Sequence, residues 1–379
     1  MAKIARIPIT NIYAEGDYTG CFLIGPQQKP MNLLLDTGSS ALAIDGRKYQ
    51  PDVRGGDTLT NQAQTDKYGD KSSWTGAVIN TRVTAGSGAA QVTLPNANCA
   101  VAYAETSNMF GKTDGILGLA YAKLDDAFKM PGPTWPREYT YEQVITGSHD
   151  QLVPYLTQLS DEGVVSDKVS FLTRRSFVHQ GGGADDPLNQ GWMIIGGGEE
   201  CMDLYTGTFQ SVKVLSDDWY STNLKAIVVG QAAPIPVSAR AAKGASSNSI
   251  VDSGTNSLNL GRQLLDAVLS KFSAEQRALL AQCIFQRGHT VSMSELGDLS
   301  QWPNLTFILE GTGNDVSLVV SPVNYWQTNT QRVGAAVAAI TPGDGAPNIL
   351  GLPLMNGYFT IFDGAANDGR GVIKFAPSK

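Results

Sequence analysis

The chain has 379 residues, of which 42% are apolar and only 17% charged, with a formal net charge of −7. Ample apolar surface excludes global disorder, and an acidic chain without Lys/Arg runs does not fit a nucleic-acid binder. The longest apolar stretch, 333–340, is far shorter than the ~18 residues of a membrane-spanning helix. At roughly 150 residues per domain, the length predicts two to three globular domains. From the charge and the short apolar stretches we expect no binding to nucleic acid or to a membrane.

Short apolar runs separated by Gly-, Asn- and Asp-rich turns predict β-strands along most of the chain. In chain order these strands are 31–36, 169–172, 192–195, 227–229, 305–309 and 358–362. Two segments have helical spacing instead: 151–159, limited by Pro154, and 264–285, where Ser273-Ala-Glu-Gln276 has the capping-box pattern that can restart a helix. The pattern as a whole is typical of an all-β fold with a few short helices.

The segment 181–187, Gly-Gly-Gly-Ala-Asp-Asp-Pro, is the most linker-like part of the chain and lies close to its midpoint. We therefore expect an N-terminal lobe over residues 1–180 and a C-terminal lobe over residues 181–379.

An internal repeat supports two related lobes. Segments 33–39 (Leu-Leu-Leu-Asp-Thr-Gly-Ser) and 249–255 (Ser-Ile-Val-Asp-Ser-Gly-Thr) share the order apolar, apolar, Asp, hydroxyl, Gly, hydroxyl. The tetrapeptide Ile-Leu-Gly-Leu follows each of them, at 116–119 and at 349–352. This is duplication on the scale of a domain, and much longer than a solenoid repeat.

The repeated motif points to paired carboxylates. A strand that delivers Asp into a tight turn with Gly lets an amide N–H point back at the carboxylate, and the following hydroxyl can bond its other oxygen. Two such carboxylates brought together share one proton, because like charges about 3 Å apart do not both ionise easily. Such a pair can activate water for direct attack on an amide. We do not assign the shared proton to either carboxyl.

These motifs resemble those of pepsin-like aspartic proteases, the bilobal kind with one Asp-Thr/Ser-Gly per lobe. The resemblance runs from about residue 18 to residue 375, and its strongest points are 35–40, 114–119, 250–255 and 349–352 followed by 358–363. It implies that Asp36 and Asp252 are the catalytic pair. By the same resemblance Gly38 and Gly254 supply inner amides, Ser39 and Thr255 hold the outer carboxylate oxygens, and Thr37 and Ser253 cross-link the two loops.

The resemblance also implies a flap and substrate pockets. The family covers its cleft with a hairpin carrying a tyrosine, and Tyr68-Gly69-Asp70 followed by Trp74-Thr-Gly76 fits that hairpin. The residues at the positions that line the pockets beside the scissile bond are Phe110, Ile116, Tyr220 and Ile250.

Several departures separate the chain from the usual pattern. Ala43 stands where many members have a tryptophan that bonds the flap tyrosine, and Trp74 can do that job instead, as in the memapsin-like members. Leu352 replaces a frequent aspartate. The four cysteines do not match the family's disulfide positions, and we expect reduced thiols. No basic prosegment precedes the start. Together these departures resemble the prosegment-less bacterial pepsin homologues, and we expect no zymogen control.

The resemblance implies an endopeptidase that cleaves polypeptide substrates between bulky apolar residues at acidic pH, needs no cofactor or metal, and binds pepstatin-like inhibitors. The three histidines, His149, His179 and His289, are scattered without metal-ligand spacing. We expect a monomer, placed in the cytoplasm because no secretory signal is present, or secreted if the start is engineered. Two alternatives stay open: a pepsin-fold binding or inhibitor protein that has lost catalysis, and a carbohydrate-binding β-protein.

Overall fold

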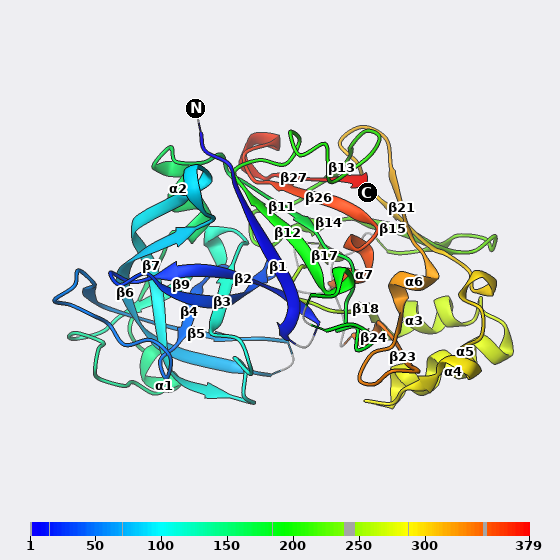
Figure 1. Ribbon diagram of the computed structural model, residues 1–379, viewed down its shortest axis with the longest axis horizontal. Helices are drawn as coiled ribbons and strands as arrows, with labels where there is room; N and C mark the ends of the chain where they lie inside the picture. The colour runs from blue at the N-terminus through cyan, green and yellow to red at the C-terminus, as the bar shows by residue number, and fades with distance from the viewer. Residues whose placement is uncertain are drawn as a thin grey trace. The chain divides into compact units, whose positions relative to one another are not determined.

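The computed structural model describes residues 2–14, 16–69, 71–183, 185–238, 247–286, 288–343 and 347–379 (Figure 1). It divides into two compact units. Unit 1 comprises Met1–Ile9, Thr19–Val169 and Met193–Gly198, and unit 2 comprises Thr10–Tyr18, Ser170–Trp192 and Glu199–Lys379. Residues 170–180, which the sequence placed in the N-terminal lobe, therefore belong to unit 2.

Four strands contain residues of both units, so the chain passes from one unit to the other along strands and not through loops alone. They are β1 (Ala5–Ala14), β2 (Asp17–Ile24), β11 (Lys168–Leu172) and β12 (Gln190–Ile195).

Unit 1 is built on a sheet with the strand order β10-β9-β5-β6-β7-β4-β8-β3-β2. Its strands are β3 (Lys29–Asp36), β4 (Leu42–Asp45), β5 (Thr58–Lys67), β6 (Ser73–Ala85), β7 (Val92–Thr106), β8 (Gly115–Gly118), β9 (Asp126–Lys129) and β10 (Ser148–Gln151). The helices are α1 (Tyr141–Val144), α2 (Tyr155–Asp161) and the 3-10 turns Gly88–Ala90 and Ala122–Leu124. Most pairs are antiparallel, but β3–β8 and β4–β7 are parallel.

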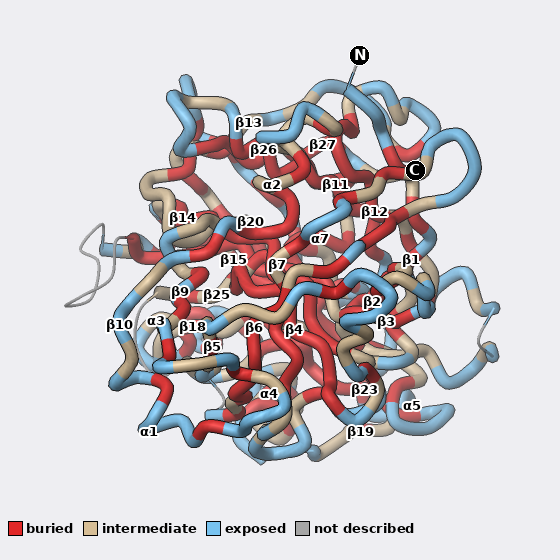
Figure 2. The backbone as a smooth tube through the Cα atoms, turned by 90° about the vertical axis from the view of Figure 1, so that its left-hand side faces the viewer, coloured by how far each residue is buried: buried red, intermediate tan, exposed pale blue. Residues whose placement is uncertain are grey.

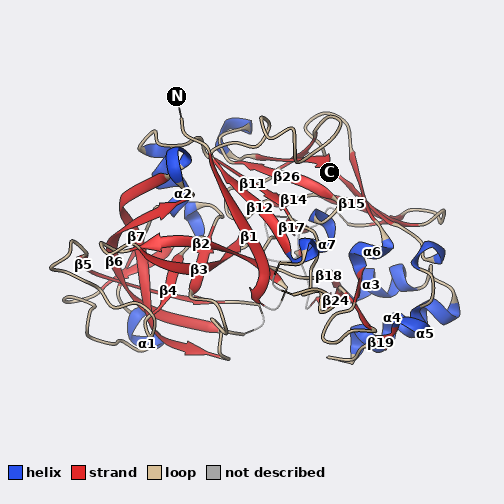
Figure 3. Ribbon diagram, in the orientation of Figure 1, coloured by secondary structure: helices blue, strands red, loops and turns tan. Residues whose placement is uncertain are grey.

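Unit 2 contains smaller sheets, ordered β14-β17-β25-β18-β24, β16-β15-β20-β21 and β19-β23-β22, and the series β26-β27-β13, which is one end of a 15-stranded sheet. The strands are β13 (Gln210–Lys213), β14 (Ser221–Thr222), β15 (Leu224–Val229), β16 (Ile235–Pro236), β17 (Ser249–Val251), β18 (Leu258–Gly261), β19 (Val291–Ser292), β20 (Leu305–Leu309), β21 (Val316–Val320), β22 (Trp326–Thr328), β23 (Ala335–Ala338), β24 (Ile340–Gly343), β25 (Asn348–Leu350), β26 (Tyr358–Asp363) and β27 (Val372–Pro377). The helices are α3 (Arg262–Leu269), α4 (Ala274–Phe285), α5 (Met293–Leu296), α6 (Pro322–Tyr325), α7 (Leu352–Met355) and the 3-10 turns Pro187–Asn189, Leu299–Gln301 and Asn367–Gly369. Figure 3 shows strands dominating both units, with helices α3 to α6 gathered in unit 2.

The all-β prediction is confirmed, and each of the six predicted strands is present. The predicted helical stretch 264–285 is two helices, because Ser273 accepts from Gln276 N and starts α4 with a complete capping box. The predicted helix over 151–159 was wrong in its first turn. Gln151 ends β10, and α2 begins only after Pro154, whose fixed φ and missing N–H suit the start of a helix and not its interior.

Both units contain buried apolar residues, and Figure 2 shows buried stretches along strands such as β4 and β26. Strand β4 of unit 1 and strand β26 of unit 2 are buried along their whole length. Edge-to-face aromatic contacts lock both cores, between Phe22 and Tyr155 in unit 1 and between Phe171 and Phe362 in unit 2. None of the helices within the described ranges is long and apolar enough to cross a bilayer.

Candidate active site

Asp36 ends strand β3 of unit 1 and is held by its own turn. Gly38 N donates to Asp36 Oδ1 at 2.7 Å, and Ser39 Oγ donates to Asp36 Oδ2 at 2.5 Å. The side chain is nearly buried, and Leu119 N donates to the backbone oxygen of Asp36 at 2.8 Å. Both oxygens of this carboxylate are therefore hydrogen-bonded by groups two and three residues further along the chain, as the motif predicts.

Asp252 follows strand β17 of unit 2 and has the same arrangement. Gly254 N donates to Asp252 Oδ1 at 2.8 Å, and Thr255 Oγ1 donates to Asp252 Oδ2 at 2.6 Å. Its backbone N–H donates to Leu350 O at 3.2 Å. The exposed fraction is 6% for both aspartates, which leaves each with a narrow opening to solvent.

The strands around the two aspartates repeat as well. In unit 1, β3 runs parallel to β8 with Asp36 opposite Gly118, and β4 pairs antiparallel with β8 and parallel with β7. In unit 2, β17 runs parallel to β25, and β18 pairs antiparallel with β25 and parallel with β24. The duplicated tetrapeptides supply β8 and β25, so the repeat in the sequence is a repeated four-strand framework.

Both Ile-Leu-Gly glycines are required by close approach of the backbone. A Cβ on Gly118 would collide with the backbone of Ser40 and Ala41, and a Cβ on Gly351 would collide with the carbonyl oxygens of Thr255 and Ser257. The turn that follows each aspartate packs directly on its own Ile-Leu-Gly strand, which explains why the two motifs occur together.

The predicted flap is the hairpin between β5 and β6, where Lys67 pairs with Ser73. Tyr68 begins the turn, with hydrogen bonds from Tyr68 N to Ser72 O and from Lys71 N to Tyr68 O at 2.9 Å each. Gly69 lies at the tip with no atom near a Cβ built there. The predicted flap residue Asp70 lies outside the described residues.

Trp74 and Tyr68 meet inside unit 1. The indole Nε1 of Trp74 donates to Tyr68 Oη at 3.2 Å, and Trp74 is buried in a cluster that includes Ala43. The small side chain of Ala43 leaves room for this indole. The Tyr68 hydroxyl also lies within reach of Ser39, and burial together with the charges of Asp66 and Asp36 holds the pKa of Tyr68 well above its ordinary value. Tyr68 is therefore a neutral hydroxyl linked to the Asp36 turn.

The predicted pocket residues lie in two groups. Phe110 and Ile116 pack against Trp74 in unit 1, with Tyr68 at the edge of the same cluster. In unit 2, Ile250 pairs with Ser221 on β14, and the neighbouring Tyr220 stacks edge-on against Phe362 with ring centroids 4.6 Å apart. All four pocket residues are almost completely buried, so their role as pocket walls stays a prediction.

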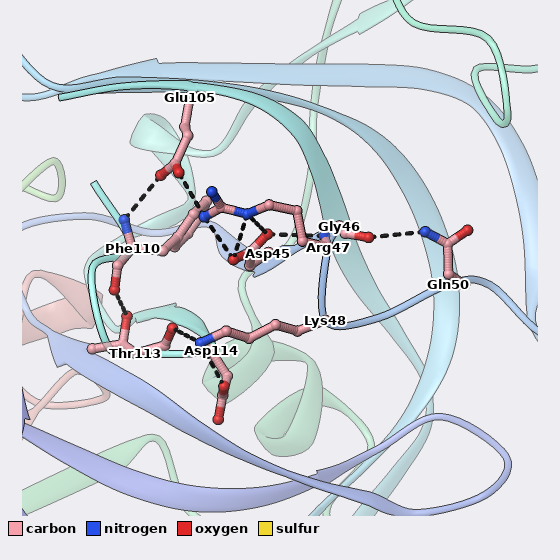
Figure 4. Close-up of polar contacts among 9 residues, drawn as sticks. All are labelled: Asp45, Gly46, Arg47, Lys48, Gln50, Glu105, Phe110, Thr113 and Asp114. Atoms are coloured by element: carbon pink, nitrogen blue, oxygen red, sulfur yellow. Dashed lines mark hydrogen bonds and ion pairs between the residues drawn. The ribbon is translucent and has the colours of Figure 1, made fainter. Parts of the chain in front are cut away.

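A polar clamp that sequence reasoning missed fixes Phe110 (Figure 4). Glu105 Oε2 accepts from Phe110 N at 3.1 Å, while Glu105 Oε1 forms a 2.6 Å ion pair with Arg47 Nη2. Arg47 is itself held by Asp45 at 2.8 Å. These residues lie on the turn after β4 and at the end of β7, and no motif in the sequence marks them as partners.

Lys48 fixes the other end of the same loop (Figure 4). Its Nζ donates to Thr113 O at 2.6 Å and pairs with Asp114 Oδ1 at 2.9 Å, and Thr113 Oγ1 donates back to Phe110 O at 2.6 Å. The loop that carries Phe110 is therefore anchored at both ends by cationic side chains from one turn.

The structure also shows the positions of Thr37 and Ser253, the predicted cross-link, and of Leu352, which differs from the family pattern. Thr37 and Ser253 are buried in their own units, and a cross-link between them would join the two units and stays a prediction. Leu352 is buried as the first residue of α7, and its N–H donates to Thr255 O at 2.8 Å. An apolar side chain thus occupies a position that follows the second Ile-Leu-Gly strand directly.

Two matching aspartate turns, each on its own four-strand framework, and a tyrosine hairpin bonded to one of them define a pepsin-like aspartic protease fold. The family model for eukaryotic aspartyl proteases matches residues 17–377, and the chain belongs to this family.

Its curated relatives are similar over most of their length at low identity. Gastricsin of Cavia porcellus is 24% identical over 371 residues, covering 94% of this chain and 79% of the relative. Pepsin B of Canis lupus familiaris is 24% identical over 378 residues, covering 96% and 83%. A beta-secretase of Strongylocentrotus purpuratus is 25% identical over 377 residues, covering 90% and 63%.

Proposed function

We propose that the protein is an active aspartic endopeptidase in which Asp36 and Asp252 form the catalytic dyad. The observation that carries the proposal is that the two carboxylates have the same hydrogen-bond pattern. Each accepts an amide N–H on one oxygen and a hydroxyl on the other. A protein that has lost catalysis would have no need to preserve this arrangement twice.

In the proposed mechanism the two carboxyls share one proton. The ionised partner takes a proton from a bound water as this water attacks the scissile carbonyl carbon, and the protonated partner donates to the carbonyl oxygen. The tetrahedral intermediate collapses when the nitrogen of the leaving amine receives a proton from the dyad. The hydroxyls of Ser39 and Thr255 and the amides of Gly38 and Gly254 stabilise the carboxylate and fix its orientation.

Substrate binding follows the same reasoning. We expect an extended polypeptide to bind along its backbone as an added strand would. The apolar side chains of Phe110, Ile116, Tyr220 and Ile250 favour bulky apolar residues beside the cleaved bond. An acidic optimum is expected because the dyad works with one shared proton. A monomeric state and a cytoplasmic location stay predictions.

The test is incubation with denatured globin and with an apolar peptide from pH 3 to pH 7. We expect cleavage that falls to background in Asp36→Ala and in Asp252→Ala and that pepstatin inhibits. A folded preparation that cleaves neither substrate at any pH would instead identify a pepsin-fold binding protein. Glycan binding that survives both substitutions would identify a carbohydrate-binding protein.

A further inference from the structure

Asp66 is a half-buried carboxyl of the flap that the proposed mechanism does not use. We propose that Asp66 is a positioning residue: it competes with Ser39 for the single hydroxyl hydrogen of Tyr68, and its protonation decides which of the two receives that hydrogen. The effect on proteolysis rests on the proposed function, whereas the exchange of hydrogen-bond partners does not.

The hairpin register places Asp66 beside the tyrosine hydroxyl. Asp66 and Tyr68 are two residues apart where strand β5 enters the flap, and residues with this spacing share one face of a strand. Asp66 lies directly opposite Trp74 in the β5–β6 register, and the indole of Trp74 reaches Tyr68 Oη. The hydroxyl therefore lies over the Asp66–Trp74 pair, within reach of the Asp66 carboxyl, whose pKa it lowers.

The donors and acceptors around this hydroxyl create a competition. A tyrosine hydroxyl has one hydrogen to donate, and the Trp74 indole can only donate to it. Ser39 Oγ gives its own hydrogen to Asp36 Oδ2, so toward Tyr68 it acts as an acceptor. An ionised carboxylate is a stronger acceptor than a hydroxyl. Ionised Asp66 consequently takes the Tyr68 hydrogen, and neutral Asp66 leaves it to Ser39 and the Asp36 turn.

The surroundings of Asp66 raise the pH at which this exchange occurs above the ordinary titration range of an aspartate. Burial is the main cause that raises the pKa of Asp66, and Asp126 on β9 adds to it. The backbone N–H of Lys67 acts in the opposite direction with a 2.7 Å bond to Asp66 Oδ1. The side chains of Lys67 and Lys71 are exposed.

The remaining ionisable groups nearby are also acidic or bound to acids. Asp125 is buried beside Asp126 and bonded by Gln64, and Asp36 lies beyond Tyr68. His149 on β10 forms a 2.9 Å pair with Asp126. Asp66 is therefore neutral at acidic pH, with the tyrosine turned toward the catalytic aspartate, and charged at higher pH.

The experiment follows the indole 1H–15N resonance of Trp74 by NMR as pH is raised, with the resonance assigned through Trp74→Phe. In the unaltered protein we expect a shift with a midpoint above the ordinary aspartate value of about 4. Asp66→Asn should abolish this transition. Asp126→Asn should move it to lower pH, because a negative charge beside Asp66 is removed. The matched control is Asp150→Asn, a carboxylate of the same sheet paired with Lys129, which should leave the transition in place.

The same variants give a second readout in the pH dependence of kcat/KM. Asp66→Asn should extend activity upward in pH, with a gain of about fivefold on the alkaline limb, the value of one hydrogen bond. Two results would overturn the proposal. One is a Trp74 transition that persists in Asp66→Asn, and the other is a fully active Asp66→Asn whose kcat/KM falls at the same alkaline pH as in the unaltered protein. If neither the unaltered protein nor any variant cleaves substrate, the proposed function fails. The NMR titration then still decides the role of Asp66.

Discussion

The turns of Asp36 and Asp252 have the same internal geometry but different surroundings. Both carboxylates accept an amide from the second following residue and a hydroxyl from the third. The Asp36 turn is connected to a hairpin, because Ser39 contacts Tyr68 and Tyr68 is held by Trp74. The Asp252 turn contacts the start of α7, where Leu352 N donates to Thr255 O.

This contrast separates two tasks. The local turn and its four-strand framework fix a carboxylate, and this part is duplicated. The hairpin that carries Tyr68 lies in unit 1 and is linked to the Asp36 turn. Carboxyl pKa values do not follow this division: burial raises the pKa of Asp66 and Asp125 in unit 1, whereas hydrogen bonds lower the pKa of Asp150 in unit 1 and of Asp186 in unit 2.

The largest expected effect tests the equivalence of the two carboxylates. Asp36→Asn and Asp252→Asn should each reduce kcat/KM on an apolar peptide by about 10⁴-fold, since each removes one partner of the acid–base pair. The double variant should lose no more than either single one, because the pair acts as a unit. Thermal unfolding provides the control for folding. A single variant that keeps a tenth of the activity would break the equivalence.

The duplicated framework is tested by Gly118→Ala and Gly351→Ala. In both positions the new Cβ meets backbone atoms that cannot rotate away, so each substitution should cost about 4 kcal/mol or more in the free energy of unfolding. Gly132→Ala in unit 1 and Gly313→Ala in unit 2 are matched controls with open space at the Cβ. Urea unfolding measures all four, and a near-neutral Gly351→Ala would show that only the first framework is tightly packed.

The raised pKa of Asp125 in unit 1 predicts that the free energy of unfolding falls as pH rises. Burial raises the pKa of Asp125 to about 7, so between pH 4 and pH 7 the folded state keeps a proton that the unfolded state has released. Asp125→Asn should therefore match the unaltered protein near pH 3.5 and exceed its unfolding free energy by about 3 kcal/mol at pH 7. Equal stability of the two proteins at pH 7 would contradict the raised pKa.

The hairpin on the Asp36 side is tested by removing the indole donor. Trp74→Phe keeps most of the buried ring but loses the 3.2 Å bond to Tyr68, and kcat/KM should fall about tenfold, as expected for one lost bond to a group near the reaction. Trp302→Phe is the control in unit 2, where the indole donates to Leu296 O at 3.1 Å. It should reduce stability and leave kcat/KM unchanged. Equal losses of activity would remove the functional distinction between the two units.

The sequence predicts the aspartate turns well because their contacts are local. The amide and hydroxyl partners of Asp36 lie two and three residues away, and a short motif records that spacing. The bond between Trp74 and Tyr68 could also be expected, since both belong to one hairpin and Ala43 leaves space for the indole. The capping box at Ser273 likewise marks the start of α4 in the sequence itself.

Other parts of the site depend on register and on contacts between distant segments. The position of Asp66 beneath the tyrosine hydroxyl follows from its pairing opposite Trp74, which no spacing along the chain specifies. The clamp on Phe110 joins Arg47 to Glu105, 58 positions apart, through a turn and a strand end without a motif. Such contacts exist only once the strands of unit 1 are aligned.

The smallest expected effect concerns Asp186, whose pKa is shifted in the opposite direction to that of Asp125. Asp186 Oδ2 and His179 Nδ1 lie 2.5 Å apart in the loop between β11 and β12, and this bond is the main cause that lowers the pKa of Asp186. A lowered carboxyl pKa stabilises the fold above the ordinary value near 4, and this contribution is lost as pH falls through the folded value. Asp186→Asn should therefore cost about 1 kcal/mol at pH 6 and progressively less toward pH 2, measured by urea unfolding. The sign is opposite to that of Asp125→Asn, so a parallel pH dependence of the two variants would contradict the opposite directions in which the pKa values of Asp125 and Asp186 are shifted.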